Sequence, residues 1–317
     1  MKRIYNYLKK DAVLTISWVL AIVSMFFIKP DKAYAGYIDW RSLGILWSLM
    51  IITKGYMQNG IFEKIGHALL ARTRKMWQLV SVLVALCFFS SMLITNDVSL
   101  ITFVPFAIMM LKQCGRWELM IPVVVLQTIA ANLGSMLTPI GNPQNLYLYT
   151  SGRLTALDFL TLLAPYAAVA LALLLALCLL LPKERVAVDA SARAPLAGKM
   201  LTLYGALSAL ALLAIAKVLP AWALAAAVFL GTLALDRGTI RQVDYTLLAT
   251  FVCFFVFVAS VKACVPVRAW LETMMARSPM AVALLTSQVI SNVPAAVLLS
   301  HFADAWQPLL IGVNIGG

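Results

Sequence analysis

The sequence predicts an all-α polytopic membrane protein with two inverted-topology repeats, each containing a re-entrant hairpin and a broken transmembrane helix. Three observations predict this class. First, 62% of the 317 residues are hydrophobic and only 12% are charged, whereas about a quarter of the residues in soluble domains are charged. Second, long apolar runs recur along the chain, and two of them are interrupted at Asn96 and Asn292. Third, these two interrupted runs resemble each other residue by residue.

Composition excludes several classes of protein. A mean hydropathy of +0.91 does not fit a cytosolic enzyme, a disordered regulator or a disulfide scaffold. The five cysteines form no CxxC pair, and only two histidines are present, so a zinc, haem or iron–sulfur site is not expected. The net charge of +12 reports orientation in a membrane and does not indicate nucleic-acid binding. We expect no cofactor and no metal, except Na+ or H+ as a coupling ion.

The elements follow in four parts. Residues 1–41 hold a basic start and an apolar run that we interpret as a retained first helix, because no small-residue cleavage site follows it. Residues 42–156 form the first repeat, with a hairpin at 77–111 and a broken helix at 119–149. Residues 157–244 form connecting helices, with a polar cytoplasmic linker at 182–199. Residues 245–317 form the second repeat, with a hairpin at 280–299.

Loop charge predicts the orientation. With the amino terminus inside, 16 Lys and Arg residues fall in predicted inside segments and 8 in outside segments, and Lys54 lies within a span. This bias agrees with the excess of Lys and Arg in cytoplasmic loops and predicts an inner-membrane protein with its amino terminus in the cytoplasm. The hairpin around Asn96 then lies on the cytoplasmic side and the one around Asn292 on the opposite side.

The two hairpins share the order of their polar residues. Ser91, Thr95 and Asn96 align with Ser287, Ser291 and Asn292. Each hairpin is followed by an apolar helix that ends in Asn-x-Gly, at residues 132–134 and 314–316. Because the charge count places the two units on opposite faces, they are expected to form an inverted repeat whose broken helices bind substrate and coupling ion near the membrane midplane.

The carboxyl end is shorter than the repeat requires. In the first unit the Asn-x-Gly is followed by residues 136–145 and then a returning half-helix, whereas the second unit stops at Gly317. We therefore expect the second repeat to be truncated and the natural protein to continue by a few tens of residues.

The stretch Thr138-Pro139-Ile140-Gly141-Asn142-Pro143-Gln144-Asn145, between the two hairpin tips, resembles the ion transporter superfamily. This group includes citrate transporter-like permeases, divalent anion symporters and arsenite permeases. The resemblance extends over residues 42–317. It implies secondary active transport of a small anion or oxyanion by alternating access, coupled to sodium or protons, and a homodimeric scaffold.

The resemblance also implies site residues. One cation site would consist of Ser91, Thr95, Asn96 and the backbone of Gly134. The other would consist of Ser287, Ser291, Asn292 and the backbone of Gly316. The third residue of each tip, a Thr near the substrate in the dicarboxylate branch, is here Asp97 or Val293. The Asn-Asp tip is similar to the arsenite permease branch, whereas residues 138–145 are similar to the citrate and dicarboxylate branch.

The remaining substrate and coupling candidates are polar or backbone-exposing residues at the helix breaks: Asn132, Ser135, Thr138, Gly141, Asn142, Gln144, Asn145 and Asn314. Each amide has a structural alternative. Asn142, Gln144 and Asn145 contact substrate or else satisfy backbone groups that Pro139 and Pro143 leave free.

For Asn132, Asn314 and Asp97 the sequence also leaves two roles open. Asn132 and Asn314 belong to the site or join neighbouring helices. Asp97 carries a coupled proton, since an intramembrane acid is a functional candidate, or caps the half-helix that begins near Val98.

Two further functions stay open. A sodium/proton antiporter centred on Asp97 would exchange ions without an organic substrate. An intramembrane enzyme is more distant, because the predicted spans lack paired acids, a Ser-His dyad and a metal set. No Walker A sequence is present, so this chain itself is not expected to use ATP. The expected partners are a small anion or oxyanion and the lipid bilayer, without nucleic acid.

Overall fold

The computed structural model describes residues 12–27, 34–70, 73–152, 154–185 and 198–317, and every regular element in these ranges is a helix. Five helical segments are long and apolar enough to cross a membrane: Met76–Ile94, Trp117–Ser135, Ala156–Leu179, Gly198–Ile215 and Tyr245–Ala263. Shorter apolar helices accompany them. The expectation of an all-helical chain with several membrane spans is therefore confirmed. Residues 1–11, 28–33 and 186–197, which include much of the predicted linker, lie outside the described residues.

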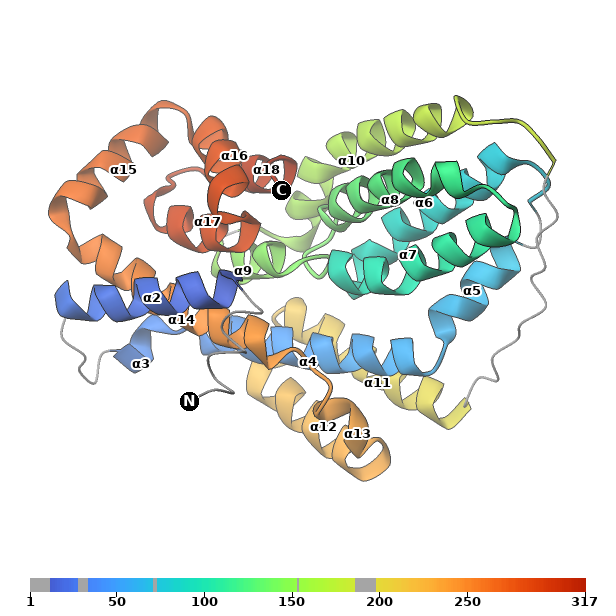
Figure 1. The fold of residues 1–317 in the computed structure, drawn as a ribbon. Coiled ribbons are helices and arrows are strands. Elements are labelled where there is room, and N and C mark those ends of the chain that lie inside the picture. The colour runs from blue at the N-terminus through green and yellow to red at the C-terminus, as the bar shows by residue number, and fades with distance from the viewer. Residues whose placement is uncertain (1–11, 28–33, 71–72, 153, 186–197) are drawn as a thin grey trace.

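The first part of the chain forms helices that run to the end of the broken helix (Figure 1). They are α2 (Ala12–Phe27), α3 (Tyr34–Tyr37), α4 (Trp40–Gln58), α5 (Ile61–Leu70), α6 (Met76–Ile94), α7 (Asn96–Gln113), η1 (Trp117–Leu119), α8 (Met120–Ser135) and α9 (Pro143–Ser151). The predicted break near Asn96 separates α6 from α7, and the predicted break within residues 119–149 separates α8 from α9. Proline and glycine at residues 139, 141 and 143 explain the second break, because they interrupt the helical backbone.

The second part begins with the connecting helices, continues through the second interrupted run and ends at residue 315. Its helices are α10 (Ala156–Leu179), α11 (Gly198–Ile215), α12 (Ala221–Leu235), α13 (Arg237–Ile240), α14 (Tyr245–Ala263), α15 (Val265–Arg277), α16 (Pro279–Ile290), α17 (Asn292–Leu299), η2 (Ser300–Phe302) and α18 (Trp306–Ile315). The predicted break at Asn292 separates α16 from α17.

The two parts share one order of elements. A long helix, a shorter helix, a pair of helices joined at a break, one 3-10 turn and a further helix occur as α4, α5, α6, α7, η1 and α8, and again as α14, α15, α16, α17, η2 and α18. The shorter helices α5 and α15 lie at opposite ends of the molecule in Figure 1. The pairs differ in length. α6 has 19 residues and measures about 28 Å, whereas α16 has 12 residues and measures about 18 Å.

An aspartate caps the first helix of each set. Asp39 accepts a hydrogen bond from the backbone N–H of Ser42 at the start of α4. Asp244 accepts from the N–H groups of Thr246 and Leu247 at the start of α14. The two caps have nearly the same backbone angles, φ −77° and ψ 82° against φ −77° and ψ 87°. Aspartate is a preferred N-cap residue because its carboxylate satisfies N–H groups that lack an intrahelical partner.

A glycine lets the last helix of each set approach the first arm of its hairpin. At Gly134 of α8 and at Gly316, just after α18, a Cβ atom would overlap a backbone carbonyl, that of Phe88 or of Leu284 respectively. Phe88 lies three residues before Ser91, and Leu284 lies three residues before Ser287. The close contacts therefore occur at matching positions, and glycine permits this approach because it has no side chain.

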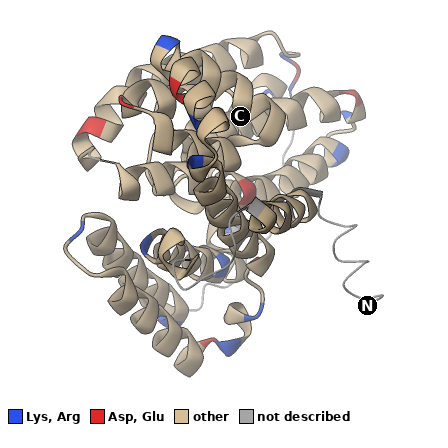
Figure 2. Cartoon of the chain, turned by 90° about the vertical axis from the view of Figure 1, so that its left-hand side faces the viewer, with Lys and Arg blue, Asp and Glu red and all other residues tan. Residues whose placement is uncertain are grey.

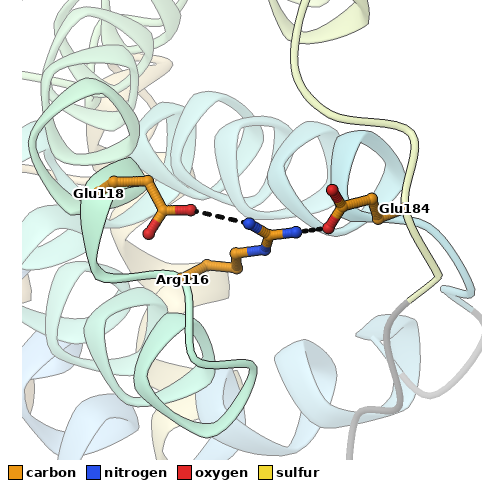
Figure 3. A network of polar contacts seen from close by, with 3 residues as sticks. All are labelled: Arg116, Glu118 and Glu184. Atoms are coloured by element: carbon orange, nitrogen blue, oxygen red, sulfur yellow. Dashed lines mark hydrogen bonds and ion pairs between the residues drawn. The ribbon is translucent and has the colours of Figure 1, made fainter.

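A cluster of charged residues ties three segments together at one end of the molecule. Arg116, just before η1, forms ion pairs with Glu118 at 3.1 Å and with Glu184 after α10 (Figure 3). The backbone N–H of Met76 donates to the carbonyl of Glu184 at 3.0 Å, and that of Trp77 donates to Pro182 at 3.2 Å. These bonds hold the start of α6, the turn before α8 and the end of α10 at one place.

The outer surface is suited to lipid. Large apolar side chains of α10 are exposed, among them Leu157, Val169, Leu173 and Leu177. Figure 2 shows that most of the ribbon carries no charged residue. Helices of this kind are stable where lipid tails cover their outer faces.

Candidate functional site

A cavity of about 270 Å³ lies where the two interrupted runs meet. Four elements line it. They are the first turn of α7 with Asn96 and Asp97, the start of α9 with Gln144, the beginning of α14, and the tip of the second hairpin with Ser291, Asn292 and Val293. Residues from both predicted tips therefore line one cavity, which we call the central cavity; Ser91, Thr95 and Ser287 are not among its lining residues.

Four helices begin at the central cavity: α7, α9, α14 and α17. A helix N-terminus carries about half a positive charge and exposes N–H groups, so this arrangement favours bound negative charge. The cavity also contains two carboxylates, those of Asp97 and Asp244, whose negative charge offsets the positive helix N-termini. Their charges act on each other, so a second anion meets repulsion unless a cation or proton offsets it.

Both hairpins break through the same unusual backbone conformation. Thr95 has φ 71° and ψ 153°, and Ser291 has φ 75° and ψ 160°. This region is populated almost only by glycine, and a residue with a side chain held there costs about 1–3 kcal/mol. Such strain persists where the surrounding structure imposes it. At the first tip, the N–H of Asn96 donates to the carbonyl of Gly141 at 3.1 Å, which joins the hairpin to the broken helix.

Gln144 lines the central cavity and has a side-chain donor without a partner. Its side chain is 2% exposed, and its Nε2 group has no hydrogen-bond partner. A buried unpaired amide costs about 1–3 kcal/mol of folding free energy, and an acceptor on a bound ligand would remove this cost. A carboxylate or oxyanion oxygen in the cavity would accept this bond.

Three other predicted amides form a buried hydrogen-bond network. Asn142 donates to the Ser135 hydroxyl at 3.0 Å and to Asn314 Oδ1 at 3.2 Å. Asn314 donates in turn to Asn145 Oδ1 at 2.7 Å. Asn145 donates to carbonyls in the break, including that of Met136 at 3.1 Å. These bonds satisfy carbonyls of the opened backbone and connect α9 with α18.

The remaining predicted residues lie in the hairpin arms and at the helix ends. Ser91 donates to the carbonyl of Phe88 at 2.9 Å, and Thr138 donates to that of Met92. Asn132 donates to the carbonyl of Gly317 at 2.7 Å. A Cβ at Gly141 would overlap the Ser135 carbonyl, so the turn there requires glycine.

On the second hairpin, Ser287 donates to the carbonyl of Ala283 at 2.8 Å. Ser287 and Gly316 line a separate cavity of about 770 Å³, which Ser291 and Asn292 also border. Ser291 and Asn292 therefore stand between two cavities.

Sequence reasoning missed Asp244 and Thr250, both of which line the central cavity from α14. From the sequence, Asp97 is the sole acid expected deep in the membrane. The signal for Asp244 was present, because an aspartate directly before an apolar run marks a helix N-cap, and Ile38-Asp39-Trp40 matches Val243-Asp244-Tyr245. The sequence does not show that Asp244 lies in the same cavity as Asp97, because that depends on how distant helices pack.

Comparison with known proteins agrees with these observations. The family model described as "Citrate transporter" matches residues 7–316. The chain is 30% identical to the inner membrane protein YbiR of Escherichia coli, over 94% of this chain and 82% of that protein. It is 28% identical to an uncharacterized transporter of Methanocaldococcus jannaschii, over 96% of this chain and 84% of that protein. A silicon efflux transporter of Oryza sativa is 32% identical over 48% of this chain and 31% of its own length.

The match to the family model covers almost the whole chain, and the two bacterial and archaeal relatives align along most of their lengths. Together with the apolar helices of the described ranges, this makes the chain an integral membrane protein. The chain belongs to the citrate transporter family, and it is a membrane transporter and not an enzyme.

Proposed function

We propose that the protein is a secondary active transporter that carries a small anion or oxyanion through the central cavity, with protons or sodium as the coupling ion. The observation that carries this proposal is Gln144, a buried amide without a partner, in a cavity where four helices begin. Helix N-termini and an amide donor are groups that recognise carboxylate or oxyanion oxygens.

Coupling follows from the charges of the same cavity. Asp97 and Asp244 repel an anion until a proton or a cation offsets them. An anion and a cation that stabilise each other's binding move together, which is the condition for symport. The uncharged form of a weak oxyacid would avoid this repulsion and would present hydroxyl groups to the carboxylates. The citrate-like and arsenite-like substrates remain the two candidate classes.

The shared order of elements supports an inverted repeat within this function. We propose that residues 42–156 and 245–317 form the two repeats, that residues 157–244 connect them, and that each broken pair of helices is a re-entrant hairpin. The amino terminus is placed in the cytoplasm. We propose one cation site at Thr95 and Asn96 and a second at Ser291 and Asn292; the matching positive φ angles of Thr95 and Ser291 support this. Alternating access then moves the cavity between the two faces of the membrane, with a homodimer as the scaffold.

A sodium/proton antiporter is the second candidate. The pair Asp97 and Asp244 favours it, because two carboxylates in one cavity can exchange a proton for a cation. In that case ion exchange would proceed without any anionic substrate.

Thermal unfolding of the detergent-purified protein distinguishes these candidates. The midpoint is measured in sodium and in choline, at two pH values, with citrate, succinate, sulfate, phosphate, arsenite or silicic acid. A ligand that binds only the folded form at 100 times its Kd stabilises it by about 2.7 kcal/mol. Stabilisation by one of these substrates, increased by sodium or by low pH, supports symport and identifies the substrate class.

Two other outcomes count against that proposal. Stabilisation by sodium or pH with no effect of any anion or oxyacid supports the antiporter. If no ion or substrate shifts the midpoint of the wild-type protein, and Gln144→Leu leaves transport in proteoliposomes unchanged, the central cavity is not the binding site.

A further inference from the structure

A second polar cavity, of about 420 Å³, lies farther along two of the helices that line the central cavity. α9 contributes Gln144 to the central cavity and Tyr147 and Ser151 to the second one. α14 contributes Thr250 to the central cavity and Val258 to the second. At 1.5 Å per residue, the nearest lining residues of the two cavities lie about 4–8 Å apart along these shared walls, from Gln144 to Tyr147 on α9 and from Thr250 to Phe255 on α14.

Aromatic side chains stand between the two cavities. The ring centroids of Tyr147 and Phe255 are 5.6 Å apart, and those of Phe251 and Phe255 are 6.2 Å apart. All three side chains are buried. Tyr147 also shares a hydrogen bond of 3.2 Å with the hydroxyl of Ser300. Along α9 and α14 these buried rings follow the residues that line the central cavity, and neither an anion nor a hydrated cation enters such an apolar cluster readily.

The charges of the second cavity differ from those of the central one. Its titratable and charged lining groups are Asp39, Lys262, His301 and two tyrosines, Tyr37 and Tyr147. Lys262 is exposed at the end of α14 and forms no ion pair among the described residues. The central cavity instead holds two carboxylates and no Lys, Arg or His among its lining residues in the described chain.

The one carboxylate of the second cavity is already satisfied. Asp39 accepts from the backbone N–H of Ser42 at 3.0 Å, from the Ser42 hydroxyl, and from Ser151 Oγ at 3.4 Å. Three donors spread its negative charge, so it opposes a bound anion less than a free carboxylate would.

His301 is oriented by its own helix turn. Its Nδ1 lies 3.0 Å from the carbonyl of Val297, and a carbonyl can only accept, so Nδ1 carries the hydrogen. In the neutral ring Nε2 is then an acceptor, so it does not donate to an anion.

We infer that this second cavity is an anion-binding site at the other end of the transport route, separated from the central cavity by Tyr147, Phe251 and Phe255, with the ammonium group of Lys262 as its counter-charge and hydrogen-bond donor. The inference rests on the proposed function for the identity of the anion. The class of ligand is a small carboxylate or oxyanion. In this arrangement Lys262 concentrates the anion at the mouth, and the aromatic cluster opens to admit it.

The first test measures the local charge without transport. Cysteine is placed at Ala259, which lines the second cavity, in a background with Cys264→Ser, because Cys264 is exposed nearby. An anionic and a cationic methanethiosulfonate reagent are compared. We expect the anionic reagent to react faster, and Lys262→Gln to lower the ratio of the two rates about tenfold.

Arg268→Gln is the matched control. It removes a cation at the same end of the molecule, but Arg268 is paired with Glu272 at 3.0 Å and does not line the cavity. The ratio is expected to stay unchanged in this variant. Equal ratios in the Ala259→Cys, Cys264→Ser background, with and without Lys262→Gln or Arg268→Gln, would overturn the inference, whatever the protein transports.

The second test is kinetic and separates the two proposals. In proteoliposomes, Lys262→Gln is expected to raise KM about tenfold for substrate supplied at the face of the second cavity, and Lys262→Arg to restore it. Thermal stabilisation by the same anion at the central cavity is expected to persist in Lys262→Gln. If the anion does not stabilise the wild-type protein, the proposed function is contradicted. If KM is unchanged in Lys262→Gln, only the second site is contradicted.

Discussion

The side-chain amides of Asn314 and Asn145 are joined by a hydrogen bond of 2.7 Å that connects the last helix of the described chain with the returning arm of the first broken helix. Both residues are buried, at 1% and 0% exposure. The bond links segments 169 residues apart in the sequence. It therefore contributes to the stability of the whole molecule and not only of one helix.

Replacement of Asn314 by Ala is expected to destabilise the protein. The change removes the donor to Asn145 and the acceptor for Asn142, and each buried polar group left without a partner costs about 1–3 kcal/mol. The thermal unfolding midpoint in detergent should fall clearly. Asn132→Ala is the control, because its bond to the Gly317 carbonyl is exposed to solvent, and its midpoint should change little. Equal midpoints for the two variants would contradict the role given to the buried network.

Gln144→Leu is expected to weaken substrate binding while leaving the fold intact. The substitution removes an unpaired buried donor, so the midpoint without ligand should stay the same or rise. The midpoint shift produced by the substrate should shrink, by an amount equivalent to about 1–3 kcal/mol of binding free energy.

Gln127→Leu is the matched control for this experiment. Gln127 is also buried, with an unpaired Oε1, but it lies among α6, α7 and α8 and does not line the central cavity. Its ligand-induced shift should equal that of the wild type. A loss of binding in both variants would show that buried glutamine, and not the central cavity, determines the effect.

Alanine at Gly134 or Gly316 is expected to destabilise the protein by about 1–3 kcal/mol, because the added Cβ overlaps a backbone carbonyl that a rigid helix cannot move away. Gly205→Ala in α11 should have the opposite sign. No atom lies within 4 Å of a Cβ at that position, and alanine is favoured over glycine in a helix by about 0.5–1 kcal/mol. Unfolding midpoints of the three variants check the prediction, and a midpoint for Gly134→Ala at or above that of the wild type would refute it.

Asp97→Asn is expected to flatten the dependence of transport on pH, because it removes a titratable group from the central cavity. Uptake in proteoliposomes is measured from about pH 5 to pH 8. Asp244→Asn should alter the profile without unfolding α14, since asparagine caps helices about as well as aspartate. Asp158→Asn, at the exposed start of α10 and away from the cavity, should leave it unchanged. If Asp97→Asn keeps the wild-type dependence of uptake on pH, Asp97 is not the proton carrier.

Native cysteines test the orientation. Cys114 lies in the turn after α7 and Cys264 lies between α14 and α15, and under the inverted arrangement they face opposite sides of the membrane. In variants that keep only one of them, a membrane-impermeant maleimide should label Cys264 in intact cells and Cys114 only after the membrane is opened. Labelling of both from the same side would contradict the inverted repeat.

Several parts of the fold and of the candidate site could be predicted from local sequence. The breaks at Asn96 and Asn292 were predicted because polar residues interrupt apolar runs in the same order. The broken helix at residues 119–149 followed from Pro139, Gly141 and Pro143, which act on the backbone beside them. The apolar composition predicted a helical membrane protein, because in lipid each helix satisfies its own backbone.

Other relationships were decided by tertiary structure alone. The sequence treated Asn142, Asn145 and Gln144 alike, yet folding pairs the first two with Asn314 and leaves Gln144 unpaired in the cavity. It also brings Asp244 to Asp97, 147 positions away in the sequence.

The physical reason is the range of the interactions involved. Hydropathy, proline and glycine act within a few residues, so the sequence by itself determined the helices, their breaks and the membrane class. The partner of a buried amide or carboxylate depends on which distant helix packs against it. Only the packed structure therefore decided which polar residues hydrogen-bond to the opened backbone and which are left without a partner.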